Sequence, residues 1–406
     1  MTDDHGQAVS SRRTGNGSAL RMKSLLVILI VFGALWILRF TAGSGQRRTV
    51  AAIQEYGGTV EYPEEEVDSR QRWLRMLLGR DAVDSPRAIT FPVTGADHEM
   101  DSLARFSDLE ELAIHSSKLT DELLQQLPPL LRLETLDLAN TPITSAALAN
   151  FDRFPRLRVL RLINTHVDDR GLASLDKLLE LKSLNLTGTQ VTGEGLAHLQ
   201  TLPNLETLLL ASAPLEDRHM DQLSQLGQLR NLFLTQTPLT GAGLEHLSEL
   251  GKLKLLDLRQ TAMTDADLPH LVPLSELISL DLDSPGITDL GLRHLASLTN
   301  LRQLKLSRLA VTGSGFSYLR DLHKLEKLVI LECPVDDAGI DHISRLAGVD
   351  SLQLSNVHIT DEGLAHLARM PSLTRLSLFY SPVTRQGVNR LKQKLPELFI
   401  EYVPAE

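Results

Sequence analysis

Leucine recurs along this chain with a period of 24 residues. It occupies twelve successive positions at that spacing: Leu112, Leu136, Leu160, Leu184, Leu208, Leu232, Leu256, Leu280, Leu304, Leu328, Leu352 and Leu376. Two positions further on, every repeat again carries leucine or isoleucine, from Ile114 to Leu378. Because one phase is kept over the whole series, the pattern indicates an array of structural repeats.

Each repeat predicts a short strand followed by a short helix. The Leu-x-Leu alternation has period two, which is typical of a strand with one buried face. In the repeat that starts at Leu184, apolar residues then recur at Leu196, Leu199 and Leu202, and Thr192 lies where a helix N-cap is expected. A single unit cannot bury both its strand and its helix. We therefore expect an α/β solenoid, with a parallel sheet on its concave side and helices on its convex side.

The repeat also matches a known sequence motif. It reads L-x-x-L-x-L-x-x-T-x-[VIL]-T-x-x-G-L-x-x-L-x-x-L, which resembles leucine-rich repeats, in particular the subclass with a cysteine at the ninth position. Cys333 stands in that column, and Thr141, Thr165, Thr189, Thr237 and Thr261 replace it elsewhere. The resemblance covers residues 85–403 and implies a horseshoe of twelve full repeats. Degenerate caps are expected at "RAITFPV" (87–93) and "LPELFIEY" (395–402).

An apolar segment precedes the repeats. "LLVILIVFGALWIL" runs from Leu25 to Leu38, and the apolar character continues to Ala42. This length favours one transmembrane signal-anchor over residues 24–42. A cleaved secretory signal or a buried helix would give a similar pattern. Basic residues flank the segment on both sides. They weakly favour a cytoplasmic N-terminus, with the repeats on the other side of the membrane, in the periplasm or on the cell surface.

The chain divides into four parts on this reading. Residues 1–23 form a basic tail, 24–42 the anchor, 43–84 a juxtamembrane linker or small N-terminal segment, and 85–403 the repeat domain. This layout resembles membrane-anchored bacterial leucine-rich repeat proteins. Those proteins carry a basic N-terminus, one span, a stretch like "VAAIQEYGGTVEY" and a tryptophan-containing helix like "RQRWLRMLLG". The resemblance implies a single-pass membrane protein.

The composition, and the fixed positions of some residues within the repeat, limit the classes of function that are possible. The net charge of −10 argues against a nucleic-acid partner, which requires a basic surface. Gly-x-Gly pairs, as at Gly193 and Gly195, and a column of histidines including His198 recur at fixed phase. We therefore interpret them as turns and helix surface, and not as a phosphate loop or a metal site. No catalytic constellation stands outside the repeat. The sequence thus predicts no enzyme, no cofactor and no metal.

The concave face is the predicted binding surface, because the repeat does not constrain the strand residues that flank the leucines. The candidate residues are Arg161, Ile163, Leu209, Phe233, Asp257, Arg259, Asp281, Asp283, Lys305, Val329, Leu331, Phe379 and Tyr380. Leu209 with Phe233, and Val329 with Leu331, are expected to form exposed apolar spots, which commonly mark binding surfaces.

Charged residues gather on neighbouring strands of the same face. Asp257 and Asp281 are expected side by side, an unfavourable arrangement for like charges. Arg259 beside Asp283, and Lys305 beside Asp281, would form a lattice of salt bridges. A bound cation, or a cationic group of a partner, is the alternative explanation of the acidic residues.

The sequence therefore favours non-catalytic recognition of a protein or an extended peptide through the concave face of a membrane-tethered repeat domain. A structural or adhesive spacer at the cell envelope is one alternative. An adaptor that docks an enzyme complex through residues 46–84 is another. The pattern specifies no oligomeric state.

Overall fold

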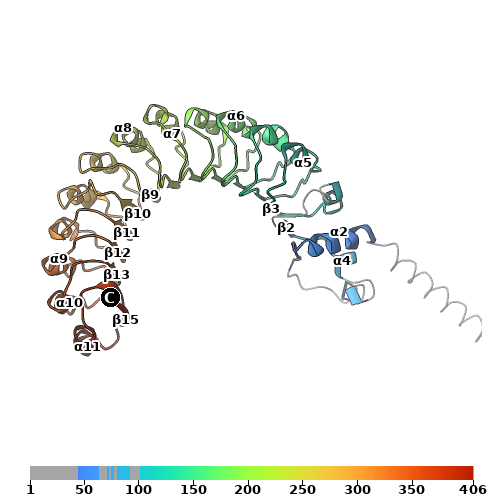
Figure 1. Ribbon diagram of the computed structural model, residues 1–406. Coiled ribbons are helices and arrows are strands. Elements are labelled where there is room, and N and C mark those ends of the chain that lie inside the picture. Colours follow the sequence, from blue (N-terminus) through green and yellow to red (C-terminus); the bar gives the residue numbers. More distant parts are fainter. Residues whose placement is uncertain (1–43, 64–70, 73–74, 77–79, 92–100, 406) are drawn as a thin grey trace, which may run out of the picture.

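The computed structural model describes residues 44–63, 71–72, 75–76, 80–91 and 101–405. These residues form an arc of stacked rungs, with strands along the inside and helices along the outside (Figure 1). The predicted anchor, Leu25 to Ala42, lies outside them. Within the described ranges, no helix has the length and apolar character needed to cross a membrane.

One sheet runs through the whole arc. In the described chain its fifteen strands follow sequence order. They are β1 (Thr59–Glu61), β2 (Ala88–Phe91), β3 (Glu111–Ile114), β4 (Thr135–Asp137), β5 (Val159–Arg161), β6 (Ser183–Asn185), β7 (Thr207–Leu209), β8 (Asn231–Phe233), β9 (Leu255–Arg259), β10 (Ser279–Asp283), β11 (Gln303–Ser307), β12 (Lys327–Leu331), β13 (Ser351–Ser355), β14 (Arg375–Ser381) and β15 (Phe399–Pro404).

The strand register follows the leucine period. From β3 to β14 every neighbouring pair is parallel, and each residue pairs with the residue 24 positions later, as Leu256 does with Leu280 and Leu280 with Leu304. The leucines of both columns are fully buried between the sheet and the helices. The predicted solenoid is therefore confirmed, and its core is one continuous aliphatic spine.

The outer layer consists mostly of 3₁₀ helices. They are η2 (Asp101–Arg105), η3 (Ser145–Arg153), η4 (Ala173–Leu175), η5 (Glu194–Thr201), η6 (Asp217–His219), η7 (Glu245–Glu249), η8 (Leu268–Leu271), η9 (Gly291–Ser297) and η10 (Ser314–Leu319). The α-helices of the repeats are α5 (Asp121–Gln125), α6 (Asp169–Leu172), α7 (Asp221–Ser224), α8 (Gly241–Leu244), α9 (Asp337–Ile343), α10 (Asp361–Leu367) and α11 (Arg385–Lys394).

Side chains in the turns fix the path between strand and helix. In several repeats a residue of the turn after the strand has positive φ, as Asn164 and Arg308 do. One residue further on, the threonine hydroxyl donates to the carbonyl three residues before it: Thr189 donates to Leu186 at 2.7 Å, and Thr261 to Leu258 at 2.8 Å. In the repeats with threonine at the ninth position, that column therefore holds a small buried hydrogen-bond donor. Cys333 is buried there, and burial raises the pKa of its thiol to about 11.

Aspartates at the start of the convex helices clamp the next repeat. Oδ1 of Asp289 accepts from the backbone N–H groups of Gly313 (3.0 Å) and Gly315 (2.7 Å), and Oδ2 accepts from the N–H (3.0 Å) and the hydroxyl (2.7 Å) of Thr312. Asp169 holds Thr192 and Gly195 in the same way. The expectation that Thr192 caps its own helix is therefore wrong. Its hydroxyl donates a hydrogen bond to the carboxylate of Asp169, and the N-cap residue of η5 is Gly193.

This clamp explains the Gly-x-Gly pairs. Gly313 has φ +121°, and a Cβ atom there would lie 2.3 Å from Cα of Gly339 in the next repeat. A Cβ on Gly315 would lie 2.9 Å from Cα of Asp289. Both positions therefore require glycine. The sequence predicted the turn, and the structure adds the close stacking of the neighbouring repeats. The histidine column lies on the convex helices, half-buried or exposed.

The N-terminal segment covers the first rung of the array. Helix α2 (Ser44–Glu55) buries Val50 and Ile53, and β1 pairs antiparallel with β2. A short helix, α4 (Arg80–Val83), packs beside α2, and Gln46 donates to the carbonyl of Asp84 at 2.5 Å. The region that precedes the repeats thus closes the open end of the hydrophobic core.

Candidate functional site

The concave surface changes character at β9. Strands β4 to β8 have three residues each, whereas β9 to β13 have five. Each longer strand turns three side chains toward the inside of the arc, alternating with the two buried leucine or isoleucine residues. The apolar candidates Leu209 and Phe233 lie immediately before this change, and the charged candidates from Asp257 to Lys305 lie immediately after it.

Leu209 and Phe233 are neighbours across β7 and β8. They are paired in register, and both side chains remain half-buried on a surface that faces solvent. Phe233 is in turn paired with Asp257 on β9. An apolar patch and a charged cluster therefore adjoin each other on three successive strands.

Asp257 and Arg259 form a bidentate pair on β9. Nη2 of Arg259 donates to Oδ2 of Asp257 at 2.6 Å, and Nε lies 2.9 Å from Oδ1. The carboxylate also accepts the backbone N–H of Arg259 at 3.0 Å. This pairing raises the pKa of the Arg259 guanidinium, the hydrogen bond to Asp257 being the largest cause. Asp257 is only 2% exposed.

A second bidentate pair spans two strands. Arg308, in the turn after β11, donates through Nε to Oδ1 of Asp283 at 2.9 Å and through Nη2 to Oδ2 at 2.7 Å. Asp283 is 7% exposed. The guanidinium thus covers the carboxylate and ties the end of β10 to the following rung.

Asp281 lies between these pairs. It is in register with Asp257 on one side and with Lys305 on the other. Its Oδ2 is 3.9 Å from Nε of Arg259, and its buried Oδ1 has no hydrogen-bond partner within the described chain. Burial raises the pKa of Asp281, and the negative charge of Asp257 raises it further, although Lys305 and Arg259 oppose the shift.

Three candidates were expected to face solvent, and for them that expectation is wrong. Asp257 and Asp283 are buried because Arg259 and Arg308 fold over them. Val329 is only 5% exposed, because it stands between the longer side chains of Lys305 and Gln353 on the flanking strands. The expected apolar spot of Val329 and Leu331 is thereby reduced to the half-buried Leu331.

The expected salt-bridge lattice exists with other partners. Arg259 is next to Asp283 in register but binds Asp257, and Asp283 binds Arg308. Sequence reasoning missed Arg308 because it lies in the turn column, outside the two strand columns that were compared. Its positive φ places it at the strand end, from where its side chain reaches back over the sheet.

The other candidates lie apart from this cluster. Arg161 on β5 is half-buried and 3.5 Å from Asp137, and Ile163 follows it. Near the C-terminal end, Phe379 is half-buried and Tyr380 is 58% exposed. The structure therefore brings together the candidates from Leu209 to Leu331 and separates the two ends.

A hollow of about 570 Å³ borders the charged cluster at the carboxyl ends of β8 to β11. Pro238, Ala262 and Pro285 supply apolar walls, and Asp283 with Arg308 supplies a polar one. The loop around Pro285 departs from the other repeats, and the hydroxyl of Ser284 donates to the carbonyl of Met263 at 2.6 Å. The concave site thus continues onto the rim of the sheet.

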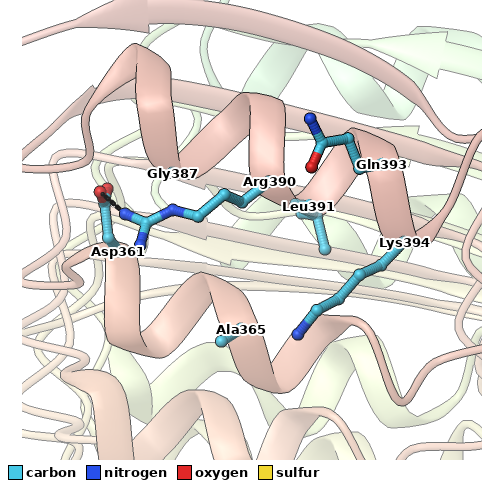
Figure 2. Close-up of a pocket in the computed structure, with 7 residues that line it drawn as sticks. All are labelled: Asp361, Ala365, Gly387, Arg390, Leu391, Gln393 and Lys394. Carbon is cyan, nitrogen blue, oxygen red and sulfur yellow. Dashed lines mark hydrogen bonds and ion pairs between the residues drawn. The ribbon is translucent and has the colours of Figure 1, made fainter.

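Another hollow, of about 240 Å³, lies between α10 and α11 on the convex side. Figure 2 shows Arg390 reaching Asp361 across it, with Lys394 along the opposite wall. Asp361 accepts from Arg390 at 2.8 Å, and also from the N–H (2.8 Å) and the hydroxyl (2.7 Å) of Thr384. These groups join two helices to each other, so we place the candidate site on the concave face.

Comparison with known proteins identifies the family. The leucine-rich repeat region family matches residues 143–399, and the chain belongs to it. A comparison with curated proteins finds no match. Solved structures share the fold. An internalin of Listeria monocytogenes is 20% identical with a TM-score of 0.56, over 82% of this chain and 94% of that one.

Two further structures share the architecture. A leucine-rich repeat protein of Leptospira interrogans is 21% identical with a TM-score of 0.52, over 74% of this chain and 80% of that one. TLR13 in complex with ssRNA13 is 20% identical with a TM-score of 0.53, over 75% of this chain and 46% of that one. At these identities the comparison shows the solenoid fold.

Proposed function

We propose that this chain is a non-catalytic recognition protein that binds another protein, or an extended peptide, on its concave face between β7 and β12. The observation that carries the proposal is the half-buried pair Leu209 and Phe233 directly beside the charged cluster of β9 to β11. An apolar patch with adjacent oriented charges is the usual composition of a protein-binding surface. The net charge of −10 favours a protein over a nucleic acid.

Site-specific photocrosslinking in intact cells tests this surface. A photoreactive phenylalanine analogue in place of Phe233 is expected to form an adduct with a partner protein. The same analogue in place of Tyr318, an exposed aromatic residue of η10 on the convex side, is expected to form none. Equal adducts at both positions, or none at Phe233, would contradict the proposal.

A second variant measures the energetic role of the patch. With the photoreactive residue moved to Leu331, the double substitution Leu209→Ser and Phe233→Ser is expected to lower adduct yield at least about tenfold, because apolar anchors dominate such interfaces. Asp257 is left unchanged, since its burial under Arg259 makes it a structural residue. An undiminished yield would remove the patch from the binding surface.

We also propose that residues 24–42 tether the repeats to a membrane and place them outside the cytoplasm. The apolar run from Leu25 to Ala42 supports this. Protease added to intact cells or spheroplasts is expected to digest the repeat domain and to spare an epitope attached before Met1. Digestion of the epitope with survival of the repeats would show the opposite orientation.

A further inference from the structure

The last convex helix, α11, differs from the two helices before it. It has ten residues, whereas α9 and α10 have seven each. Its sequence, RQGVNRLKQK, carries four basic residues and no acidic one, in a chain whose net charge is −10. The residues by which it exceeds α10 are Lys392, Gln393 and Lys394. The longer helix therefore presents a positive surface at the C-terminal end of the arc (Figure 1).

Two of these cations border the hollow between α10 and α11. Arg390 and Lys394 form its walls, and Figure 2 shows the side chain of Lys394 extending toward Ala365. Nη2 of Arg390 donates to Asp361, whereas the ammonium of Lys394 makes no hydrogen bond or ion pair within the part of the chain that the structure describes. Asp361 is the one carboxylate among the described residues of the lining, and it also accepts from Thr384. The lining therefore has one positive charge in excess.

The other carboxylates of this region do not neutralise that charge. Glu362 on α10 and Glu397 after α11 are exposed, and among the described residues neither forms an ion pair with Arg390 or Lys394. Asp341 on α9 forms its ion pairs with cations of its own repeat and of the next one. The two cations at the hollow thus share the single carboxylate of Asp361.

The preceding repeat shows what occupies the equivalent space. Between α9 and α10, the carboxylate of Asp341 accepts from Arg369 at 2.7 Å and lies 3.4 Å from Nδ1 of His366. One repeat later, Ala365 holds the position of Asp341, and Arg390 holds that of His366. The chain therefore supplies a carboxylate between α9 and α10, but only an alanine methyl group between α10 and α11.

We propose that this hollow binds the acidic side chain, aspartate or glutamate, of a peptide segment in another protein. The carboxylate lies over Ala365, in the place that Asp341 takes one repeat earlier. It accepts from the N–H groups of Arg390 that Asp361 does not use, and from the ammonium of Lys394. Charge-assisted hydrogen bonds of this kind are short and strong, and a guanidinium group matches the geometry of a carboxylate. The site is on the convex side, so the inference is independent of the proposed concave surface.

The surroundings of the hollow favour an acidic peptide over a small free acid. Arg385 and Lys392 are exposed and extend the positive surface of α11 beyond the hollow, so further carboxylates of an acidic segment are attracted to it. A free acid of the size of succinate would meet only the two cations of the lining. The hollow, of about 240 Å³, accommodates one side chain with its methylene groups against Leu391.

Fluorescence anisotropy of the full-length chain in non-ionic detergent micelles tests the inference. The probe is a labelled peptide of alternating glutamate and glycine, and the peptide with glutamine in place of glutamate is the neutral reference. We expect only the acidic peptide to bind at low ionic strength. Ala365→Asp is expected to weaken its binding at least about tenfold, because the new carboxylate occupies the hollow as Asp341 does one repeat earlier. An acidic peptide that does not bind the wild-type chain would contradict the inference.

Asn389→Asp is the matched control. It makes the same change of net charge in the same repeat column, but Asn389 is exposed and is not among the residues that line the hollow. Its effect should stay below about threefold, as is usual for an exposed charge. Equal losses in Ala365→Asp and Asn389→Asp would show that the peptide responds to net charge alone, and would overturn the inference.

A second pair of variants removes a cation and leaves the hollow open. Lys394→Gln is expected to weaken binding of the acidic peptide at least about tenfold, and Arg385→Gln, outside the lining, less than about threefold. Competition with sodium succinate distinguishes the source of the carboxylate. Succinate that displaces the peptide at a concentration equal to the Kd of the peptide would show a site for a small acid and would overturn the assignment to a protein partner.

Discussion

Replacing Phe154 with alanine is expected to lower the free energy of unfolding by about 3–5 kcal/mol. Phe154 is fully buried beneath the convex layer, and its ring packs edge-on against Phe151 with the centroids 5.5 Å apart. The substitution removes most of the side chain from a closely packed spine. The loss of stability has two parts, the lost burial of the ring and the cavity that it leaves. The cavity persists because the neighbouring rungs are held in register and cannot close the gap.

Urea or guanidinium unfolding followed by circular dichroism measures this effect. Phe154→Leu is the control, because leucine or methionine fills the same column in the following repeats, from Leu178 to Met370. It should cost less than about 1.5 kcal/mol, since the replacement conserves most of the volume. If alanine and leucine were equally tolerated, the spine would not be close-packed at this rung.

The sequence predicted the fold because one physical requirement repeats twelve times. The two leucine columns, as at Leu256 and Leu258, can be buried together only if successive strands stack in register, and the structure has this register. The glycine pairs were interpreted correctly as turns, and the histidine column lies on the convex helices, as its fixed phase indicated. The pattern did not predict whether each convex helix is an α-helix or a 3₁₀ helix, because a segment of one or two turns can form the hydrogen bonds of either type.

The candidate site was predicted less completely. Register alone places Asp257, Asp281 and Asp283 on one face, but it does not show which carboxylate each arginine selects. That choice depends on side-chain length and on the positive-φ turn that carries Arg308. Burial of Asp257 and Asp283 follows from those pairings, so it could not be read from the strand columns.

The two sides of the arc use aspartate for different purposes. On the convex rim, aspartates such as Asp289 accept several hydrogen bonds from the next repeat and are structural. On the concave face, the buried Oδ1 of Asp281 has no such donor among the described residues. The aspartates of the convex rim therefore hold the rungs together, whereas Asp281 makes no comparable set of hydrogen bonds to a neighbouring rung within the described chain.

Replacing Asp289 with alanine is expected to lower the free energy of unfolding by about 3 kcal/mol, because it leaves four donors of the following repeat without their acceptor. Asp321→Ala is the control, since Asp321 is exposed and, within the part of the chain that the structure describes, accepts a hydrogen bond only through its backbone carbonyl. Chemical unfolding at neutral pH measures both variants. An equal, small effect of the two substitutions would show that water replaces the clamp.

The stabilisation by Asp289 should also depend on pH, because it requires the ionised carboxylate. Burial raises the pKa of Asp289, but the donors from Gly315, Thr312 and Gly313 outweigh it, and the pKa is lowered overall. A lowered pKa in the folded chain means that the ionised clamp contributes fully above the unfolded value near 3.8, and that this stability is lost as pH falls through the folded value. The difference between wild type and Asp289→Ala should therefore be constant from pH 7 to about pH 5 and shrink below about pH 4. A difference that stayed constant throughout the acid range would mean that the carboxylate is not held as an anion by the next rung.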